Sequence, residues 1–264
     1  MNGIHAHPTR KLGKRPYRRD PRNLQFAKYL IPEKLPKPQP HTDWSQKVSN
    51  PIGMHLNDSI GDCTCAAVAN AIELVTANAG RQVSIPDAHV LKMYEVIGGY
   101  IPGNPSTDNG ALIGDALKYW HNTGLKDSSG AIHKLGAYLQ VDSNNVAHRE
   151  LAIQLFGWVN LGVMLPATAQ KQNLLWQCAD NLTSSDGAPG SWGGHSVIQN
   201  DYSPTGRGVM TWNVKLWGMS VNFDRDYVDE AWTGISDDWV HNIGLAPSGF
   251  DMPQLIKDLE ALKS

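Results

Sequence analysis

Apolar residues recur at helical intervals through the first half of the chain, between polar turns. The clearest case follows the turn at residues 57–62, where apolar side chains from Ala67 to Val75 fall on one strongly buried face of a helix. Asp62 is the expected N-cap, so Cys63 should lie in the first turn of this helix. The same spacing predicts three more helices, over residues 86–97, 112–120 (with Gly124 at the C-cap) and 145–155.

Short apolar runs between turn residues replace this pattern in the second half. They predict β-strands joined by hairpins, at residues 159–165, 195–199 and 208–213. A final amphipathic stretch predicts a terminal helix over residues 252–263. Helices followed by an antiparallel sheet indicate an α+β fold in two lobes, with a helical lobe at residues 41–155 and a β lobe at residues 156–245.

The first 40 residues differ from both halves. They are basic, poor in apolar periodicity and end in a proline-rich stretch, which predicts an extended arm over residues 1–40 and one domain over residues 41–264. Basic residues crowd this arm between Arg10 and Arg19. We interpret the run as a solvated surface. The alternatives are a contact for an acidic partner or nucleic acid, and a protein partner for the arm.

Composition narrows the function classes. The net charge of −2 argues against a nucleic-acid binder, and no apolar run reaches the length of a membrane span. The N-terminus lacks the apolar stretch of a secretory signal, so a cytoplasmic protein is expected. Three cysteines do not make a disulfide framework, and Cys63 and Cys65 lack a second ligand pair at zinc spacing. Neither a metal nor another cofactor is expected.

A helix start at Cys63 is a setting that activates a thiol. The helix N-terminus stabilises a thiolate, and an adjacent imidazolium adds to that effect. Among the ten histidines, His195 follows two glycines and opens an apolar strand, which presents its side chain at a strand end. Cys63 and His195 are therefore the candidate nucleophile and base. Cys65 should point about 200° away from Cys63, into the core, and Cys178 is interpreted as an ordinary thiol.

The segment leading to Cys63 resembles the nucleophile segment of papain-like cysteine peptidases. That family has a glutamine six positions before its cysteine and a glycine two positions before it. Here Asn57 and Gly61 take these places. His195 lies 132 residues after Cys63 (195 − 63), within the family's spacing. Asn213, 18 residues further on, resembles the asparagine that orients the imidazole.

Three more features carry the likeness, which extends over about residues 45–240. Asn109–Gly110 and the helix after it resemble the stretch whose glycines pair with substrate backbone, and residues 161–165 resemble the first long strand of the second lobe. Trp217–Gly218 resembles the family's Trp-Gly, although Trp212 is an alternative for the tryptophan that shields the imidazole. The candidate substrate-binding residues are Gly110, Gly194 and Trp217.

The resemblance implies hydrolysis of a peptide or isopeptide bond in a polypeptide substrate, through a thioester acyl-enzyme. Cys63 would attack the carbonyl, Asn57 and the Cys63 N–H would stabilise the oxyanion, and His195 would protonate the leaving amine. Two other hypotheses stay open. One is a papain-like domain of little or no activity that serves as a binding or structural component of a larger assembly, such as a virus particle. The other makes the arm a short inhibitory pro-segment.

Overall fold

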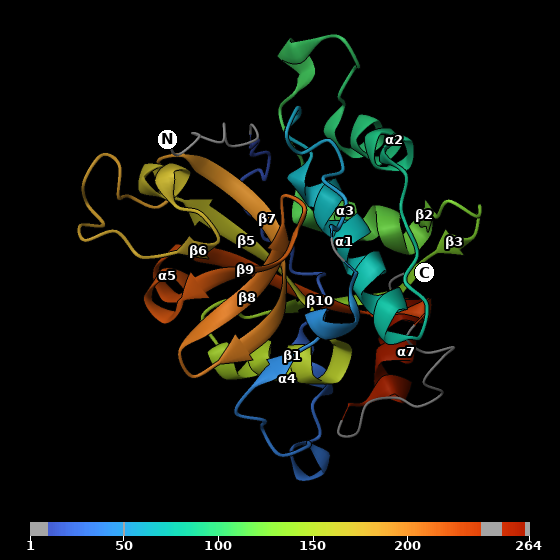
Figure 1. The fold of residues 1–264 in the computed structure, drawn as a ribbon. Coiled ribbons are helices and arrows are strands. Elements are labelled where there is room, and N and C mark those ends of the chain that lie inside the picture. The colour runs from blue at the N-terminus through green and yellow to red at the C-terminus, as the bar shows by residue number, and fades with distance from the viewer. Residues whose placement is uncertain (1–9, 50, 239–249, 262–264) are drawn as a thin grey trace.

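The computed structural model describes residues 10–49, 51–238 and 250–261. Three helices form the first lobe: α1 (Cys63–Asn78), α2 (Asp87–Gly98) and α3 (Ile113–Asn122). Their apolar faces meet in one core cluster, and Figure 1 shows the three helices beside the sheet. The expected helices are thus present, and Gly124 follows α3 with φ +77°, the left-handed conformation of a helix C-terminus.

A single sheet forms the second lobe, in the strand order β4-β10-β5-β7-β8-β9-β6. Its neighbouring strands are antiparallel except for the short pair β6–β9, and β1 pairs with β7 outside this order. The strands are β1 (Thr42–Asp43), β4 (Leu135–Val141), β5 (Val159–Leu165), β6 (Leu175–Trp176), β7 (Gly193–Ser203), β8 (Gly206–Thr211), β9 (Val214–Ser220) and β10 (Val228–Ser236). A separate pair joins β2 (Leu125–Lys126) to β3 (Ile132–His133).

The sheet has two buried faces because successive residues of a strand point to opposite sides. Val197 of β7 lies in the core on the far side of the sheet, whereas its neighbour Ile198 lies in the core of the helical lobe. Helices α4 (Val146–Phe156) and α5 (Val221–Tyr227) pack on the far side. Both β4 and α4 precede residue 156, where the sequence pattern placed the start of the β lobe, yet both contribute to the sheet's core.

Helix α1 crosses the interface between the lobes with nearly every side chain buried. Small residues permit this close packing, and Cys65 is fully buried in the helical lobe, as expected. Asp62 occupies the N-cap position and its carbonyl accepts the first helical hydrogen bonds, although its side chain does not cap the helix. Cys63 is therefore the first residue of α1.

The arm is not free of the domain. Its 3-10 turn η1 (Phe26–Tyr29) buries Phe26 and Tyr29 in the core beside the sheet, next to α7 (Met252–Ala261). No helix among the described residues is long and apolar enough to cross a membrane. The remaining short 3-10 turns are η2 (Pro32–Lys34), η3 (Ser45–Lys47), η4 (Pro105–Thr107) and η5 (Ala167–Lys171).

Candidate active site

Cys63 lies at the N-terminus of α1 and faces strand β7. The backbone N–H of Ser196, the residue after His195, is close enough to the Cys63 sulfur to favour its thiolate. Burial acts in the opposite direction and is the larger effect, raising the pKa of the Cys63 thiol to about 12. The side chain is 1% exposed. In this structure the candidate nucleophile is a covered, protonated thiol.

His195 is held by contacts on two sides. Its Nε2 lies 2.7 Å from Thr211 Oγ1, and its ring stacks on Trp212 with centroids 4.3 Å apart. Burial, with a contribution from the charge of Arg10, lowers the pKa of His195 to about 3, so the ring is neutral. Its Nδ1 has no hydrogen-bond partner among the described residues, so no hydrogen bond joins it to Cys63.

The place expected for Asn213 beside His195 belongs to Thr211. Asn213 is exposed in a two-residue turn between β8 and β9, closed by the pair Thr211↔Val214. Both turn residues, Trp212 and Asn213, have positive φ (+45° and +58°). Asparagine is favoured in such a turn because it tolerates the left-handed conformation. Asn213 is thus a turn residue of the hairpin, and the hydroxyl of Thr211, the residue before the turn, makes the hydrogen bond to the His195 imidazole.

Asn57 lies close before α1, in the loop that leads to the nucleophile. It is 2% exposed, and its Nδ2 donates to the carbonyl of Ile60 at 3.3 Å. The same amide also lies close enough to the buried Asp62 carboxyl group to favour its charged form, so an oxyanion would compete with Asp62 for the amide N–H. The loop is fixed from the helical lobe by Asp108, which accepts from the Gly61 N–H at 3.0 Å and from the Tyr94 hydroxyl at 2.6 Å. Asp108 was not predicted from the sequence, because its contact with Gly61 joins residues 47 positions apart.

The cleft between the lobes is filled by residues 10–15 of the arm, which we call the cleft segment. Gly13 lies over the nucleophile, and its backbone N–H also favours the Cys63 thiolate. A Cβ atom on Gly13 would lie 1.7 Å from the Gly61 carbonyl oxygen, so only glycine fits there. Main-chain hydrogen bonds tie the segment to both lobes: Lys11 N–H to Asn57 O (2.9 Å), Lys14 N–H to Gly194 O (3.0 Å), Ala111 N–H to Gly13 O (2.8 Å) and Arg15 N–H to Ala111 O (2.9 Å).

All three candidate substrate-binding residues contact the cleft segment. A Cβ on Gly110 would lie 2.0 Å from the Gly13 carbonyl oxygen, and one on Gly194 would lie 2.4 Å from that of Lys14. The guanidinium of Arg10 lies over the ring of Trp217, 4.6 Å from its centroid. The two glycines therefore permit a close main-chain approach, and Trp217 offers a flat surface beside it.

The sequence matches no protein-family model and no curated protein. Among solved structures, xylellain, a cysteine protease from Xylella fastidiosa, superposes with a TM-score of 0.65 at 16% identity, covering 86% of this chain and 97% of that one. Digestive procathepsin L 3 of Tenebrio molitor gives 0.58 at 17% identity, covering 84% and 75%. The Carica candamarcensis cysteine protease in complex with E-64 gives 0.53 at 14%, covering 75% and 98%. The chain has the papain-like fold.

Within the papain-like fold, the interpretation of the basic run between Arg10 and Arg19 as a solvated surface is only partly correct. Lys11, Arg15 and Arg19 are exposed, but the side chain of Lys14 is fully buried. Charge alone could not single out Lys14, because its burial depends on acidic residues more than 200 positions later in the chain.

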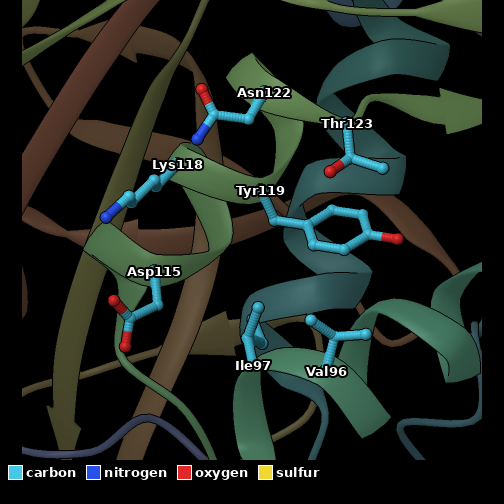
Figure 2. Close-up of a pocket in the computed structure, with 7 residues that line it drawn as sticks. All are labelled: Val96, Ile97, Asp115, Lys118, Tyr119, Asn122 and Thr123. Atoms are coloured by element: carbon cyan, nitrogen blue, oxygen red, sulfur yellow. The ribbon is translucent and has the colours of Figure 1, made fainter. Parts of the chain in front are cut away.

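A second hollow lies away from the papain-like cleft. Figure 2 shows Asp115, Lys118 and Tyr119 of α3 beside Val96 and Ile97 of α2, around a cavity of about 330 Å³. Its lining contains no thiol and no imidazole, so it lacks the groups that nucleophilic catalysis of this kind requires. The candidate site residues Cys63 and His195 lie in the cleft and not in this hollow.

Proposed function

We propose that this chain is a cysteine peptidase that cleaves peptide or isopeptide bonds, and that its structure is a latent state of the enzyme. The observation that carries the proposal is the meeting of Cys63, at the start of α1, with the strand of His195: the Ser196 N–H faces the sulfur, and the base has one ring nitrogen held and the other unpartnered. The papain-like fold of the chain and the cysteine proteases among its structural neighbours support this activity.

The Thr211 hydroxyl can accept a hydrogen bond from His195 Nε2–H, which belongs to the tautomer that the reaction needs. When Nε2–H donates to the Thr211 hydroxyl, the lone pair of Nδ1 is left for the proton of the Cys63 thiol. The sulfur then attacks the substrate carbonyl carbon, and the oxyanion accepts from the Cys63 N–H and from the Asn57 amide. The C–N bond breaks as Nδ1–H protonates the leaving amine, and water, deprotonated by His195, hydrolyses the thioester.

The latent state follows from the cleft segment. It covers the thiol and the imidazole, and burial favours the neutral form of both, with the pKa of Cys63 at about 12 and that of His195 at about 3. The thiolate is the nucleophilic form, so this state is unreactive. One of the structural neighbours is described as a procathepsin, which agrees with a form that precedes activity.

The test uses the full chain opened at one residue. Deleting residues 1–40 would also remove Phe26 and Tyr29 from the core, so we choose Gly13→Val, whose side chain clashes with Gly61 and displaces only the cleft segment. The exposed Lys11 provides the matched control, Lys11→Ala, which keeps every main-chain bond. Iodoacetamide alkylation followed by peptide mass spectrometry measures the alkylation rate of Cys63, and the half-buried Cys178 is the internal reference.

We expect Gly13→Val to alkylate at Cys63 near neutral pH, faster than at Cys178, and to hydrolyse members of a peptide library. Adding His195→Ala should slow alkylation, because the imidazolium that stabilises the thiolate is gone. Adding Cys63→Ala should abolish hydrolysis. If Cys63 in the opened variant has the rate and pH profile of an ordinary thiol, the peptidase proposal is wrong.

The second candidate is a papain-like domain that binds polypeptide without cleaving it, as a component of a larger assembly. The absence of a hydrogen bond between His195 Nδ1 and Cys63 favours it. It predicts that the opened variant binds peptides, leaves them intact, and has an unactivated thiol at Cys63.

A further inference from the structure

The most deeply buried charge of the cleft segment is Lys14. Its side chain has no exposed surface, and its Nζ lies 2.8 Å from Asp229 Oδ2 and 3.4 Å from Glu230 Oε2. Two carboxylates therefore meet one ammonium group: the side chain of Glu230 is buried, whereas that of Asp229 is 31% exposed. A pair of this kind persists only where geometry compensates the loss of hydration.

The space around Lys14 has the shape of a side-chain pocket. Its floor is Gly162 of β5, where a Cβ atom would lie 2.1 Å from Lys14 Cε. Asp229 and Glu230, at the start of β10, supply the charge at its end. We call these three residues the acidic pocket. Glycine in the middle of a strand often marks a close approach by another group, and here that group is the aliphatic stem of a lysine.

The negative charge extends beyond the two carboxylates. Asp229 and Glu230 also line an adjoining cavity of about 590 Å³, whose other acidic residues are Asp20 and Asp142 and whose one cation is Arg19. Glu230 is 4% exposed, and its Oε1 accepts from the Trp232 indole at 2.7 Å, which fixes the carboxyl group toward the pocket. Burial raises the pKa of Glu230 and the charge of Lys14 lowers it, so a cation in the pocket favours the charged carboxylate.

The acidic pocket binds the residue of the cleft segment that directly follows the one lying over Cys63. Gly13 covers the Cys63 sulfur, and Lys14, the next residue, binds the carbonyl of Gly194 beside His195. The main-chain groups of Gly194 and Ala111 are open to any extended peptide once the cleft segment leaves. Such a peptide would present a side chain to the same pocket.

We propose that the acidic pocket is a substrate subsite that selects a lysine or arginine side chain, and that Lys14 occupies it in the latent state. This inference rests on the proposed peptidase function. The subsite selects by charge because an uncharged chain of the same length would leave the carboxylates of Asp229 and Glu230 without the cation that Lys14 now supplies. A lysine or arginine of the substrate would take the place of Lys14, so the cleft segment and the substrate compete for the same contacts with Asp229 and Glu230.

The test compares two peptidyl electrophiles that are identical except for lysine or norleucine at one position, varied along the peptide. They are applied to the full chain carrying Gly13→Val and Lys14→Ala, in which the segment is displaced and the pocket is empty. At one position we expect the lysine probe to modify Cys63 about tenfold faster or more. Asp229→Asn with Glu230→Gln should reduce the lysine rate to the norleucine rate, and Gly162→Val should block the lysine probe. Asp142→Asn, in the adjoining cavity but without a contact to Lys14, is the matched control and should keep the preference.

The outcomes separate the two proposals. Equal modification of Cys63 by both probes at every position overturns the subsite and leaves the peptidase intact. If neither probe modifies Cys63, the peptidase proposal fails, and calorimetry with unreactive lysine and norleucine peptides on the same variant decides the subsite. A preference for lysine that Glu230→Gln removes supports it, and equal binding or none overturns it.

Discussion

Two parts of the same arm bind the domain by opposite means. The cleft segment, residues 10–15, is held by main-chain hydrogen bonds and by the ion pairs of Lys14. The anchor segment, which we define as residues 24–31, is held by apolar burial: Phe26 is 1% exposed and Tyr29 is fully buried.

The difference concerns what can replace each segment. Polar contacts in the cleft are equally available to water or to a substrate peptide, so their net contribution to stability is small. Burying a large aromatic side chain has no such competitor and contributes about 1.5–3 kcal/mol. The anchor segment is therefore a permanent part of the fold, whereas the cleft segment can be exchanged while the fold persists.

We expect the largest effect, on the free energy of unfolding, from a substitution in the anchor segment. Phe26 packs edge-on against Phe156 at 6.3 Å and stacks with Phe250 at 6.1 Å, so Phe26→Ala leaves a cavity between three elements. We expect the free energy of unfolding in urea to fall by about 3–5 kcal/mol. The exposed Glu33 gives the control, since Glu33→Ala should change it by no more than about 0.5 kcal/mol. A loss below about 1 kcal/mol for Phe26→Ala would place the anchor outside the core.

An intermediate effect is expected from opening the cleft segment alone. The side chain of Gly13→Val overpacks against Gly61, which destabilises the closed position of the cleft segment by about 1–3 kcal/mol. Each step of about 1.4 kcal/mol changes the opening equilibrium about tenfold. Hydrogen exchange at the Lys14 N–H should therefore accelerate by about 5–150-fold. The Gln140 N–H, which donates to Leu24 O in the anchor segment, is the internal reference and should keep its rate. Equal acceleration at both sites would mean that the arm opens as one unit.

The same contrast separates what the sequence could predict from what it could not. Local patterns identified β5 at residues 159–165 and the start of α1 at Cys63, because periodicity and caps are properties of neighbouring residues. Strand β4 was missed although alternation of buried residues at 135, 137, 139 and 141 was a usable signal.

Contacts between distant segments were not predictable in this way. Thr211 reaches His195 because β7 pairs with β8 and the chain turns into β9 directly after Thr211. A spacing rule carried over from a resemblance cannot foresee where this hairpin turns, so it placed the bond at Asn213, which lies in the turn. The burial of Lys14 likewise depends on Asp229, 215 residues away.

The smallest expected effect concerns the polar edge of the anchor. Hydrogen bonds from Lys28, and then from Tyr29, hold the pKa of the Asp258 carboxyl at about 2, below its ordinary 3.8. A depressed folded-state pKa stabilises the fold above pH 3.8, and this contribution is lost as the pH falls from 3.8 toward 2. Asp258→Asn should therefore lower the thermal midpoint slightly at pH 6 and not at pH 2. Because Lys28, the first of these two partners, is 57% exposed, its ion pair with Asp258 is weakened by solvent, and the shift should be smaller than for Phe26→Ala. A variant whose deficit persisted unchanged at pH 2 would show that the carboxylate's charge is not what ties the anchor to α7.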